Sequence, residues 1–264
     1  MRKIIEFEEF TWDMTKALPQ AYYCHVNKIP YQVICKPGLS DVYYFVEDII
    51  ETSAPIQPSD FYTYSNDAPY YTQYEWTPPP LKNEFSNKIK FDKPTVVIQN
   101  KYSLEWFEQP SNYFSIDFLK KIFKILENKY QIIYIRPRGS EKKYFVDDNE
   151  ILDFNDYDFI KENFPSIYTI EDALRENPEM SYNQAQFSLE ATSGKHLAVA
   201  GGNACVSAYF GGELIIFDSP DARESGRGIW QSNSWLSELG DSNVIGFDSY
   251  NKIYNHIKKN WVKK

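Results

Sequence analysis

The sequence has 264 residues, of which 42% are hydrophobic, 25% charged and 17% aromatic, and its formal net charge is −9 at pH 7. A chain of this length forms one large domain or two small ones and can bury a sizeable core. Its negative charge repels a phosphate backbone, which excludes general nucleic-acid binding but still allows a local basic pocket for a diphosphate. The three cysteines, Cys24, Cys35 and Cys205, are widely spaced, which predicts neither a disulfide framework nor a zinc site.

The amino terminus, Met1 to Glu6, lacks the apolar stretch of a signal peptide. No window of the sequence approaches the ~18 uncharged apolar residues of a membrane span. We therefore expect a cytoplasmic protein without a transmembrane segment.

The first part of the chain predicts a strand, a polar loop, a helix and a second strand. In chain order these are Lys3 to Phe7, Thr11 to Thr15, Leu18 to Asn27 and Tyr31 to Cys35. Residues 52 to 94 are rich in Pro, Tyr, Ser and Asn and indicate a loop-rich connection.

The second part alternates more regularly between apolar strands and helices. Its predicted strands are Thr95 to Ile98, Gln131 to Ile135, Tyr168 to Ile170, Leu197 to Ala200 and Leu214 to Phe217. Its predicted helices are Ser115 to Lys129, Phe159 to Phe164, Ser181 to Ser193, Asn203 to Tyr209 and Ser249 to Trp261. Aliphatic strands that alternate with helices favour a parallel sheet covered on both faces.

These elements predict an α/β fold with an amino-terminal half over residues 1–94 and a nucleotide-binding, Rossmann-like half over residues 95–264. In such sheets ligands bind beyond the carboxyl ends of the strands. We therefore look for functional residues directly after each predicted strand.

The sharpest feature is the turn Gly201-Gly202-Asn203, which joins a buried strand to a helix. Two glycines let the backbone approach a ligand and leave N–H groups at a helix start, where a phosphate is favoured. The pattern is not GxGxxG, so it is no dinucleotide fingerprint, and a tight turn without a ligand explains it equally well.

Two further polar clusters follow strands. Arg136 and Arg138 come after Gln131 to Ile135, and a guanidinium suits a diphosphate or a carboxylate. Asn100 and Lys101 follow Thr95 to Ile98. Solvated strand ends are the alternative for each cluster, but three such clusters on one rim favour a binding site.

Asp13 lies in the predicted loop after the opening strand, where a carboxylate could accept a proton from an acceptor hydroxyl. A helix N-cap or a solvated side chain is the simpler interpretation. Asp156 and Asp158 have the DxD spacing of metal-dependent GT-A glycosyltransferases. Because they precede a predicted helix, helix capping explains them more simply than a metal site.

The helix, strand, Gly-Gly turn, short helix and closing strand over Ser181 to Phe217 resemble the donor-binding half of GT-B-type glycosyltransferases. The strand and helix pattern from Thr95 to Ile135 is similar to the start of that half. The first part of the chain looks like a shortened acceptor half of heptosyltransferase-like enzymes, in which an acidic residue follows the first strand.

The resemblance implies two facing Rossmann-like halves and an inverting transfer from a UDP-, GDP- or ADP-linked sugar to an oligosaccharide or glycan acceptor. It implies no cofactor and no obligatory metal. Asn100, Lys101, Arg136, Arg138, Gly201, Gly202 and Asn203 would then bind the donor, and Asp13 would be the catalytic base. The alternatives are a non-catalytic α/β module that binds a sugar, a nucleotide or a protein, and a GT-A enzyme that uses Asp156 and Asp158.

Overall fold

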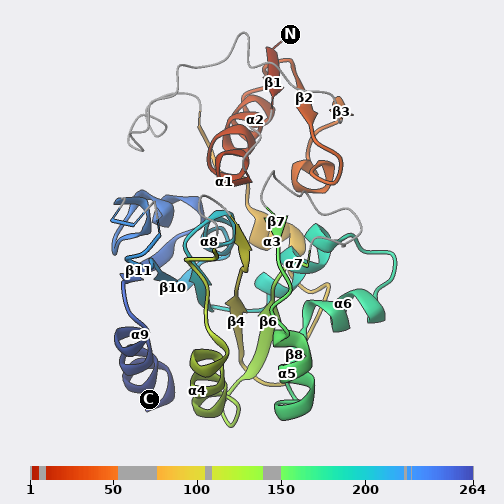
Figure 1. Ribbon diagram of the computed structural model, residues 1–264. Helices are drawn as coiled ribbons and strands as arrows, with labels where there is room; N and C mark the ends of the chain where they lie inside the picture. The colour runs from red at the N-terminus through yellow and green to blue at the C-terminus, as the bar shows by residue number, and fades with distance from the viewer. Residues whose placement is uncertain are drawn as a thin grey trace.

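Two parallel β-sheets lie one above the other and share a layer of helices (Figure 1). The computed structural model describes residues 2–5, 10–52, 76–104, 109–138, 150–222, 225–226 and 228–263, and in Figure 1 the smaller, amino-terminal sheet lies at the top. The predicted α/β class with parallel sheets and a shortened amino-terminal half is confirmed.

The larger sheet has six strands, all parallel, in the order β8-β6-β4-β9-β10-β11. They are β4 (Thr95–Gln99), β6 (Gln131–Ile135), β8 (Tyr168–Thr169), β9 (Lys195–Val199), β10 (Gly212–Phe217) and β11 (Ser242–Phe247). Counted in chain order this is 3-2-1-4-5-6, the doubly wound order of Rossmann folds, in which ligands bind where the order reverses. The reversal lies between β4 and β9.

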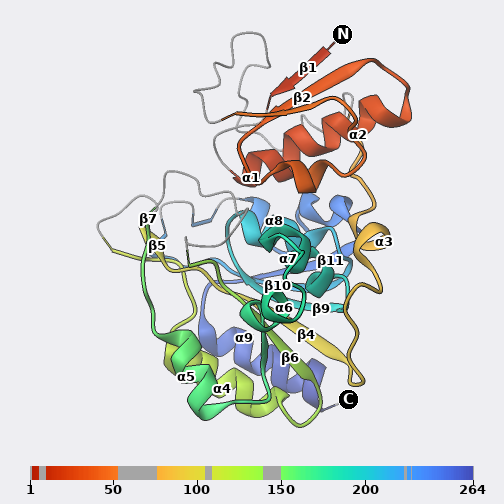
Figure 2. The ribbon, with the colours of Figure 1, turned by 90° about the vertical axis from the view of Figure 1, so that its right-hand side faces the viewer.

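Helices cover both faces of this sheet (Figure 2). They are α4 (Ile116–Leu126), α5 (Asp156–Asn163), α6 (Ile170–Glu176), α7 (Tyr182–Glu190), α8 (Gly202–Ala208) and α9 (Tyr250–Ile257), which continues as a π-helix over Lys258–Val262. The N-caps of α4, α7 and α9 are Ser115, Ser181 and Ser249, and each accepts a backbone N–H through its side chain. The helix starts predicted at these serines are confirmed.

The smaller sheet contains β1 (Arg2–Ile5), β2 (Tyr31–Cys35) and β3 (Ile49–Glu51), all parallel. A continuous helix connects β1 to β2 and consists of α1 (Phe10–Trp12), a π-helix (Asp13–Ala17) and α2 (Leu18–Val26). A 3₁₀ helix (Ser40–Tyr43) precedes β3, and α3 (Leu81–Phe85) follows it.

The polar loop predicted over Thr11 to Thr15 is wrong, because this segment is helical. The side chains of Phe10, Met14, Ala17 and Ala21 recur at intervals of three and four residues and are all buried. This is the spacing of one helix face, and its burial outweighs the weak helix propensity of the threonines. The helical periodicity was present in the sequence and begins at Phe10, eight residues before the helix we predicted from Leu18.

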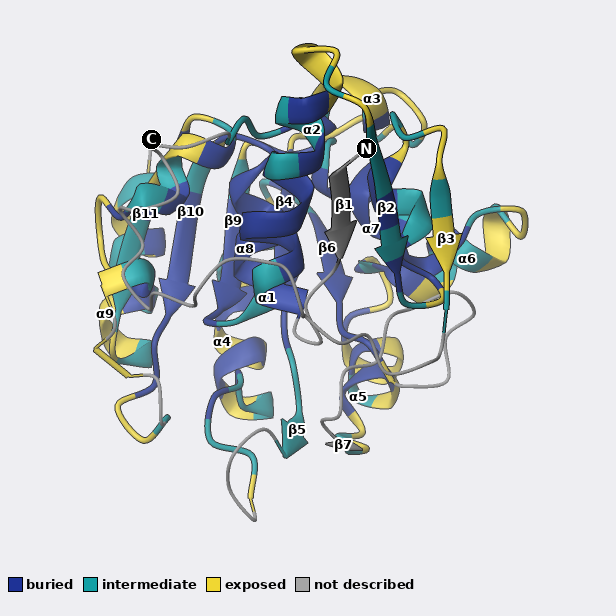
Figure 3. Ribbon diagram, turned by 90° about the horizontal axis from the view of Figure 1, so that it is seen from above, coloured by how far each residue is buried: buried dark blue, intermediate teal, exposed yellow. Residues whose placement is uncertain are grey.

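Two apolar cores occupy the two faces of the large sheet. Leu197 and Val199 of β9 enter one core with α4, α5 and α9, whereas Ala198 enters the other with α8 and the amino-terminal helix. The second core therefore contains buried residues of both sheets, such as Val33 of β2 and Ala198 of β9. Figure 3 shows the buried colouring of α8 and β9. The boundary predicted after residue 94 falls between α3 and β4, and it stays a prediction.

Several short elements were not predicted: β3, α3, β11, two 3₁₀ helices (Gly228–Trp230 and Trp235–Leu239), and an antiparallel pair of β5 (Ser103–Leu104) with β7 (Glu150–Ile151). In the described part of the chain, no helix has the length and apolar character needed to cross a membrane.

Candidate functional site

The loops that follow β4 and β9 meet at the point where the strand order reverses. Gly201 follows β9 with φ 139° and ψ −170°, a conformation that only glycine adopts readily. The Nζ of Lys101, two residues after β4, lies 3.2 Å from the position that a Cβ on Gly201 would take. Two of the predicted clusters are therefore brought together at the switch point of the sheet.

Gly202 marks the contact between the two halves of the molecule. A Cβ on Gly202 would lie 2.7 Å from a ring carbon of Phe10, which belongs to α1. Nearby, the hydroxyl of Tyr209 donates to the carbonyl of Met14 at 2.5 Å. The amino-terminal helix thus packs directly on α8, and glycine at position 202 makes the close approach possible.

Asp13 lies one residue before Met14 on this packed helix, and its side chain is only 2% exposed. It is therefore placed at the contact between the halves, where the resemblance puts a base, but on a buried helix instead of an open loop. Its catalytic role stays a prediction.

Asn203 turns its side chain away from solvent and into a buried polar network. Its Oδ1 accepts from Gln186 Nε2 at 3.3 Å, and its carbonyl accepts from Gln99 Nε2 at 3.1 Å. Gln99 also donates to Glu190, whose second carboxylate oxygen lies 2.6 Å from Nδ1 of His196. This network connects the start of α8 to β4.

Asn100 is also buried, and hydrogen bonds to the protein use both ends of its amide. Its Nδ2 donates to the Phe114 carbonyl and to the Tyr134 hydroxyl, each at 3.1 Å. Its Oδ1 accepts from the backbone N–H of Lys101 and of Phe114. Asn100 therefore fixes the loop that carries Lys101, and its predicted place at an open rim is not found.

Arg136 differs most from its predicted position. Its side chain is 1% exposed, and its Nε and Nη2 donate to the two carboxylate oxygens of Asp156 at 2.6 and 2.5 Å. Burial alone would lower the pKa of Arg136, but the hydrogen bonds and charge of Asp156 raise it above its ordinary value. The expectation that Arg136 faces solvent at the rim is wrong, since Asp156 already occupies its bidentate face.

The same ion pair decides the arrangement of Asp156 and Asp158. Asp156 is fully buried and also accepts from the Tyr134 hydroxyl, whereas Asp158 is exposed on the first turn of α5. The two carboxylates therefore share no site, and the paired DxD arrangement on which the metal-dependent alternative depends is not found at Asp156 and Asp158. Among the described residues, no group of three or more His, Cys, Asp or Glu side chains could hold a metal ion.

Arg138 remains at the surface. Its Nε lies 3.0 Å from an oxygen of Glu171, and its guanidinium carbon lies 4.2 Å from the ring centroid of Tyr157. Its side chain is 41% exposed, so this ion pair is screened by water.

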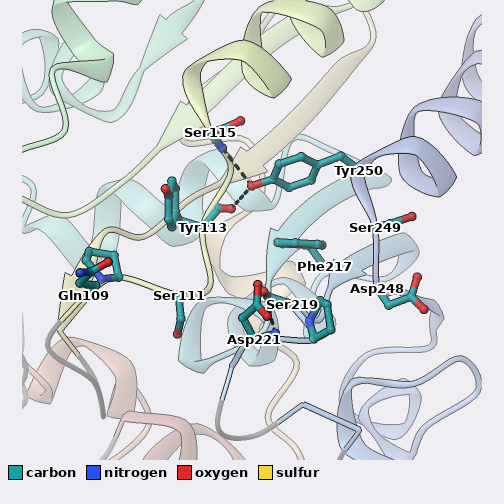
Figure 4. Close-up of a pocket in the computed structure, with 12 residues that line it drawn as sticks. Gln109, Ser111, Tyr113, Ser115, Phe217, Ser219, Asp221, Asp248, Ser249 and Tyr250 are labelled. Atoms are coloured by element: carbon teal, nitrogen blue, oxygen red, sulfur yellow. Dashed lines mark hydrogen bonds between the residues drawn. The ribbon is translucent and has the colours of Figure 1, made fainter.

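A pocket of about 660 Å³ opens at the carboxyl ends of β10 and β11, beside the switch point (Figure 4). The residues that line it are Gln109, Pro110, Ser111, Tyr113, Ser115, Phe217, Ser219, Pro220, Asp221, Asp248, Ser249 and Tyr250. Its wall combines aromatic rings, serine hydroxyls and two carboxylates, and these described lining residues include no Lys or Arg.

Asn112 connects this pocket to the glycine turn. Its Nδ2 donates to the carbonyl of Ala200 at 2.9 Å, and its Oδ1 accepts from the backbone N–H of Ser219 at 3.3 Å. One side chain thus spans the distance between the residue before Gly201 and the lining of the pocket. The switch point and the pocket form one continuous region of the carboxyl edge.

Sequence reasoning missed this pocket. Ser219 to Asp221 follow a predicted strand and could have been found by the rule that identified Gly201. The segment Asp248 to Tyr250 could not, because β11 was not recognised as a strand. Its central residues Val244, Ile245 and Gly246 form too short an apolar run to distinguish a strand from a loop.

No protein-family model matches the sequence, and no curated protein matches it either. Among solved structures, that of the E. coli ADP-heptose LPS heptosyltransferase II superposes with a TM-score of 0.60 over 98% of each chain. The chain has a GT-B-like fold. The two sequences are 10% identical, so the likeness concerns the fold alone.

Proposed function

We propose that this protein is a glycosyltransferase that moves a sugar from a nucleotide-sugar donor to a glycan acceptor. The observation that carries the proposal is the meeting of Lys101 and Gly201 at the switch point of a GT-B-like sheet, directly beside an aromatic pocket. The switch point is where doubly wound sheets bind nucleotides.

The charged diphosphate and the nucleoside of the donor would bind to different parts of the carboxyl edge. Lys101 supplies a cation and Gly201 an open backbone, which together suit the diphosphate. The pocket next to them suits the nucleoside, because it offers rings for stacking and hydroxyls for hydrogen bonds. Asn112 joins the two parts and sets their spacing.

The acceptor would enter from the amino-terminal half, where Asp13 lies. In the transfer, the Asp13 carboxylate takes the proton of an acceptor hydroxyl while that oxygen forms a bond to the anomeric carbon. The bond from that carbon to the donor phosphate breaks, and the nucleoside diphosphate leaves against Lys101. Since Asp13 is 2% exposed, the acceptor reaches it only when the two halves move apart.

Donor binding is tested by thermal unfolding with UDP, GDP, ADP and CDP, with and without EDTA. A nucleotide at a hundred times its Kd is expected to add about 2.7 kcal/mol of stability, and this gain should survive EDTA. No stabilisation by any of the four, together with no release of diphosphate from nucleotide sugars, would leave a non-catalytic module as the better description.

The role of Asp13 is tested by replacing it with an isosteric, uncharged residue. Asp13→Asn is expected to lose sugar transfer by a factor of about 10²–10⁴ while it still binds the nucleotide diphosphate. The matched control is Asp41→Asn, because Asp41 also lies at the contact between the halves and accepts from Gln184 at 3.0 Å. Equal turnover in the two variants would remove Asp13 from the mechanism.

A further inference from the structure

The pocket beside the switch point has rigid aromatic walls. Tyr250 stacks on Phe118 with a centroid distance of 4.3 Å, and its hydroxyl accepts from the Ser115 N–H at 3.1 Å and donates to the Tyr113 carbonyl. Phe217 packs against Tyr250 at 4.7 Å. Figure 4 shows the rings of Tyr250 and Phe217 next to each other in the pocket lining. Rings held in this way offer a flat partner a surface at little entropic cost.

The opposite wall is held in a similar way. The ring of Tyr113 lies 4.9 Å from that of Tyr102 and 5.4 Å from that of Phe154, and Tyr102 and Phe154 stack on each other at 4.4 Å. A pocket bounded by fixed aromatic groups on two sides fits a planar ring.

The charged groups of the pocket are both acidic. Asp221 belongs to the turn after β10, where its backbone N–H donates to the Ser219 hydroxyl at 3.4 Å. Asp248 stands directly before the N-cap of α9 and pairs with Lys252 at 2.7 Å. Asp248 thus already places a negative charge at the start of α9, which disfavours a phosphate there. These groups favour a partner that donates hydrogen bonds.

We infer that this pocket holds the donor's nucleobase and selects a base with an exocyclic amino group, with Asp221 as the specificity-determining residue. The inference rests on the proposed function, since it names the base of the donor that the protein would use. Adenine, guanine and cytosine present an amino group that donates to a carboxylate. Uracil presents carbonyl oxygens at the corresponding edge positions, and the charge of Asp221 repels them.

The discrimination is measured by isothermal titration calorimetry with ADP, GDP, CDP and UDP, which share the diphosphate and the ribose. The best of the three amino-bearing nucleotides is expected to bind at least about tenfold more tightly than UDP, as for other hydrogen-bonded base contacts. The asparagine side chain in Asp221→Asn can donate to a carbonyl oxygen, so this variant should lose most of the difference. Asp92→Asn, an exposed carboxylate before β4 at the other edge of the sheet, should keep it.

Each outcome separates the inference from the function on which it rests. If UDP binds as tightly as the other three or more tightly, the base assignment is overturned while the donor site stands. The same holds if the preference persists unchanged in Asp221→Asn. If none of the four nucleotides binds, the proposed function fails and the inference fails with it.

Discussion

Two strand ends on the same edge of the sheet carry basic residues, but one of these residues is buried and the other is partly exposed. At the end of β6, Arg136 turns inward and is 1% exposed, and at the end of β4, Lys101 lies partly exposed over Gly201. From the sequence the two positions are equivalent, since each puts a cation next to an apolar strand. What separates them is Asp156, which comes from α5 and occupies the guanidinium of Arg136 with both carboxylate oxygens.

The difference shows that a cation at a strand end is closed to a ligand when an element of the fold supplies a buried, bidentate counter-ion, as Asp156 does for Arg136. Tyr134 and Tyr157 surround the Arg136 pair, and burial raises the pKa of both hydroxyls above the ordinary tyrosine value. This corner is therefore a closed structural unit. The Lys101 corner instead adjoins the glycine turn and the aromatic pocket.

The largest expected effect is the loss of stability when the buried ion pair of Arg136 and Asp156 is broken. Arg136→Ala leaves the carboxylate of Asp156 buried without its partner, which is expected to cost about 3–5 kcal/mol of unfolding free energy in urea titrations. Arg138→Ala is the matched control, because its surface ion pair with Glu171 should contribute at most about 1 kcal/mol.

If Arg136 instead bound the donor, Arg136→Ala would change ligand binding and not stability. Arg136→Ala would then keep its urea midpoint and lose affinity for nucleotide diphosphates. That outcome would show that the arginine at the end of β6 has the ligand-binding role that we propose for Lys101 at the end of β4.

The next largest effect tests how much the packing of the two halves against each other depends on glycine at position 202. Gly202→Ala places a methyl group 2.7 Å from a carbon of the Phe10 ring, so the ring or α1 must shift away from α8. We expect a loss of about 1–3 kcal/mol, as for other overpacked contacts. Gly194→Ala is the control, since a Cβ there meets nothing within 4 Å. A Phe10→Leu change in the Gly202→Ala background should restore part of the stability, and its failure to do so would locate the strain elsewhere.

A smaller effect concerns Lys101 at the end of β4. Lys101→Ala is expected to weaken nucleotide diphosphate binding by about tenfold, the usual size of a charge-assisted hydrogen bond, while binding of the bare nucleoside stays unchanged. Lys120→Ala, an exposed lysine on α4, should change neither. Calorimetry with both ligand forms makes the comparison. An equal loss for nucleoside and diphosphate would place Lys101 next to the base instead of the phosphates.

Much of the fold could be predicted from the sequence because local patterns determine it. Buried strands such as Gln131 to Ile135 are short aliphatic runs, and helix starts at Ser115 and Ser181 follow from hydrogen bonds within three residues. The Gly201 turn could be found for the same reason, because a glycine pair between strand and helix is a local signal.

The rest depends on contacts between distant residues. No local pattern shows that Arg136 will meet Asp156, twenty positions later, or that Phe10 will lie against Gly202. The pocket draws its lining from three loops between Gln109 and Tyr250, and these come together only through the strand order. Strand order is set by packing of the whole sheet, which spacing alone does not reveal.

The smallest effect is a pH dependence at the pocket end of β10. Burial raises the pKa of Asp218, and the charge of Asp248 adds to this, while a hydrogen bond from the Gly226 N–H lowers it in part. Among contacts with described residues, its Oδ2 accepts from Gly226 at 3.0 Å and its buried Oδ1 accepts none.

Because the folded protein holds this proton more tightly than the unfolded chain does, the stabilisation from Asp218 is complete below the ordinary pKa of 3.8. It is lost as the pH rises through the raised value. Asp218→Asn removes the ionisation, so this variant should unfold at a slightly higher temperature than wild type at pH 7 but not at pH 4. Thermal unfolding across this range makes the measurement, with Asp158→Asn as the exposed control. A parallel shift at both pH values would show that Asp218 is ionised equally in the folded and unfolded protein, and the pocket end of β10 would then be as well solvated as the surface of α5.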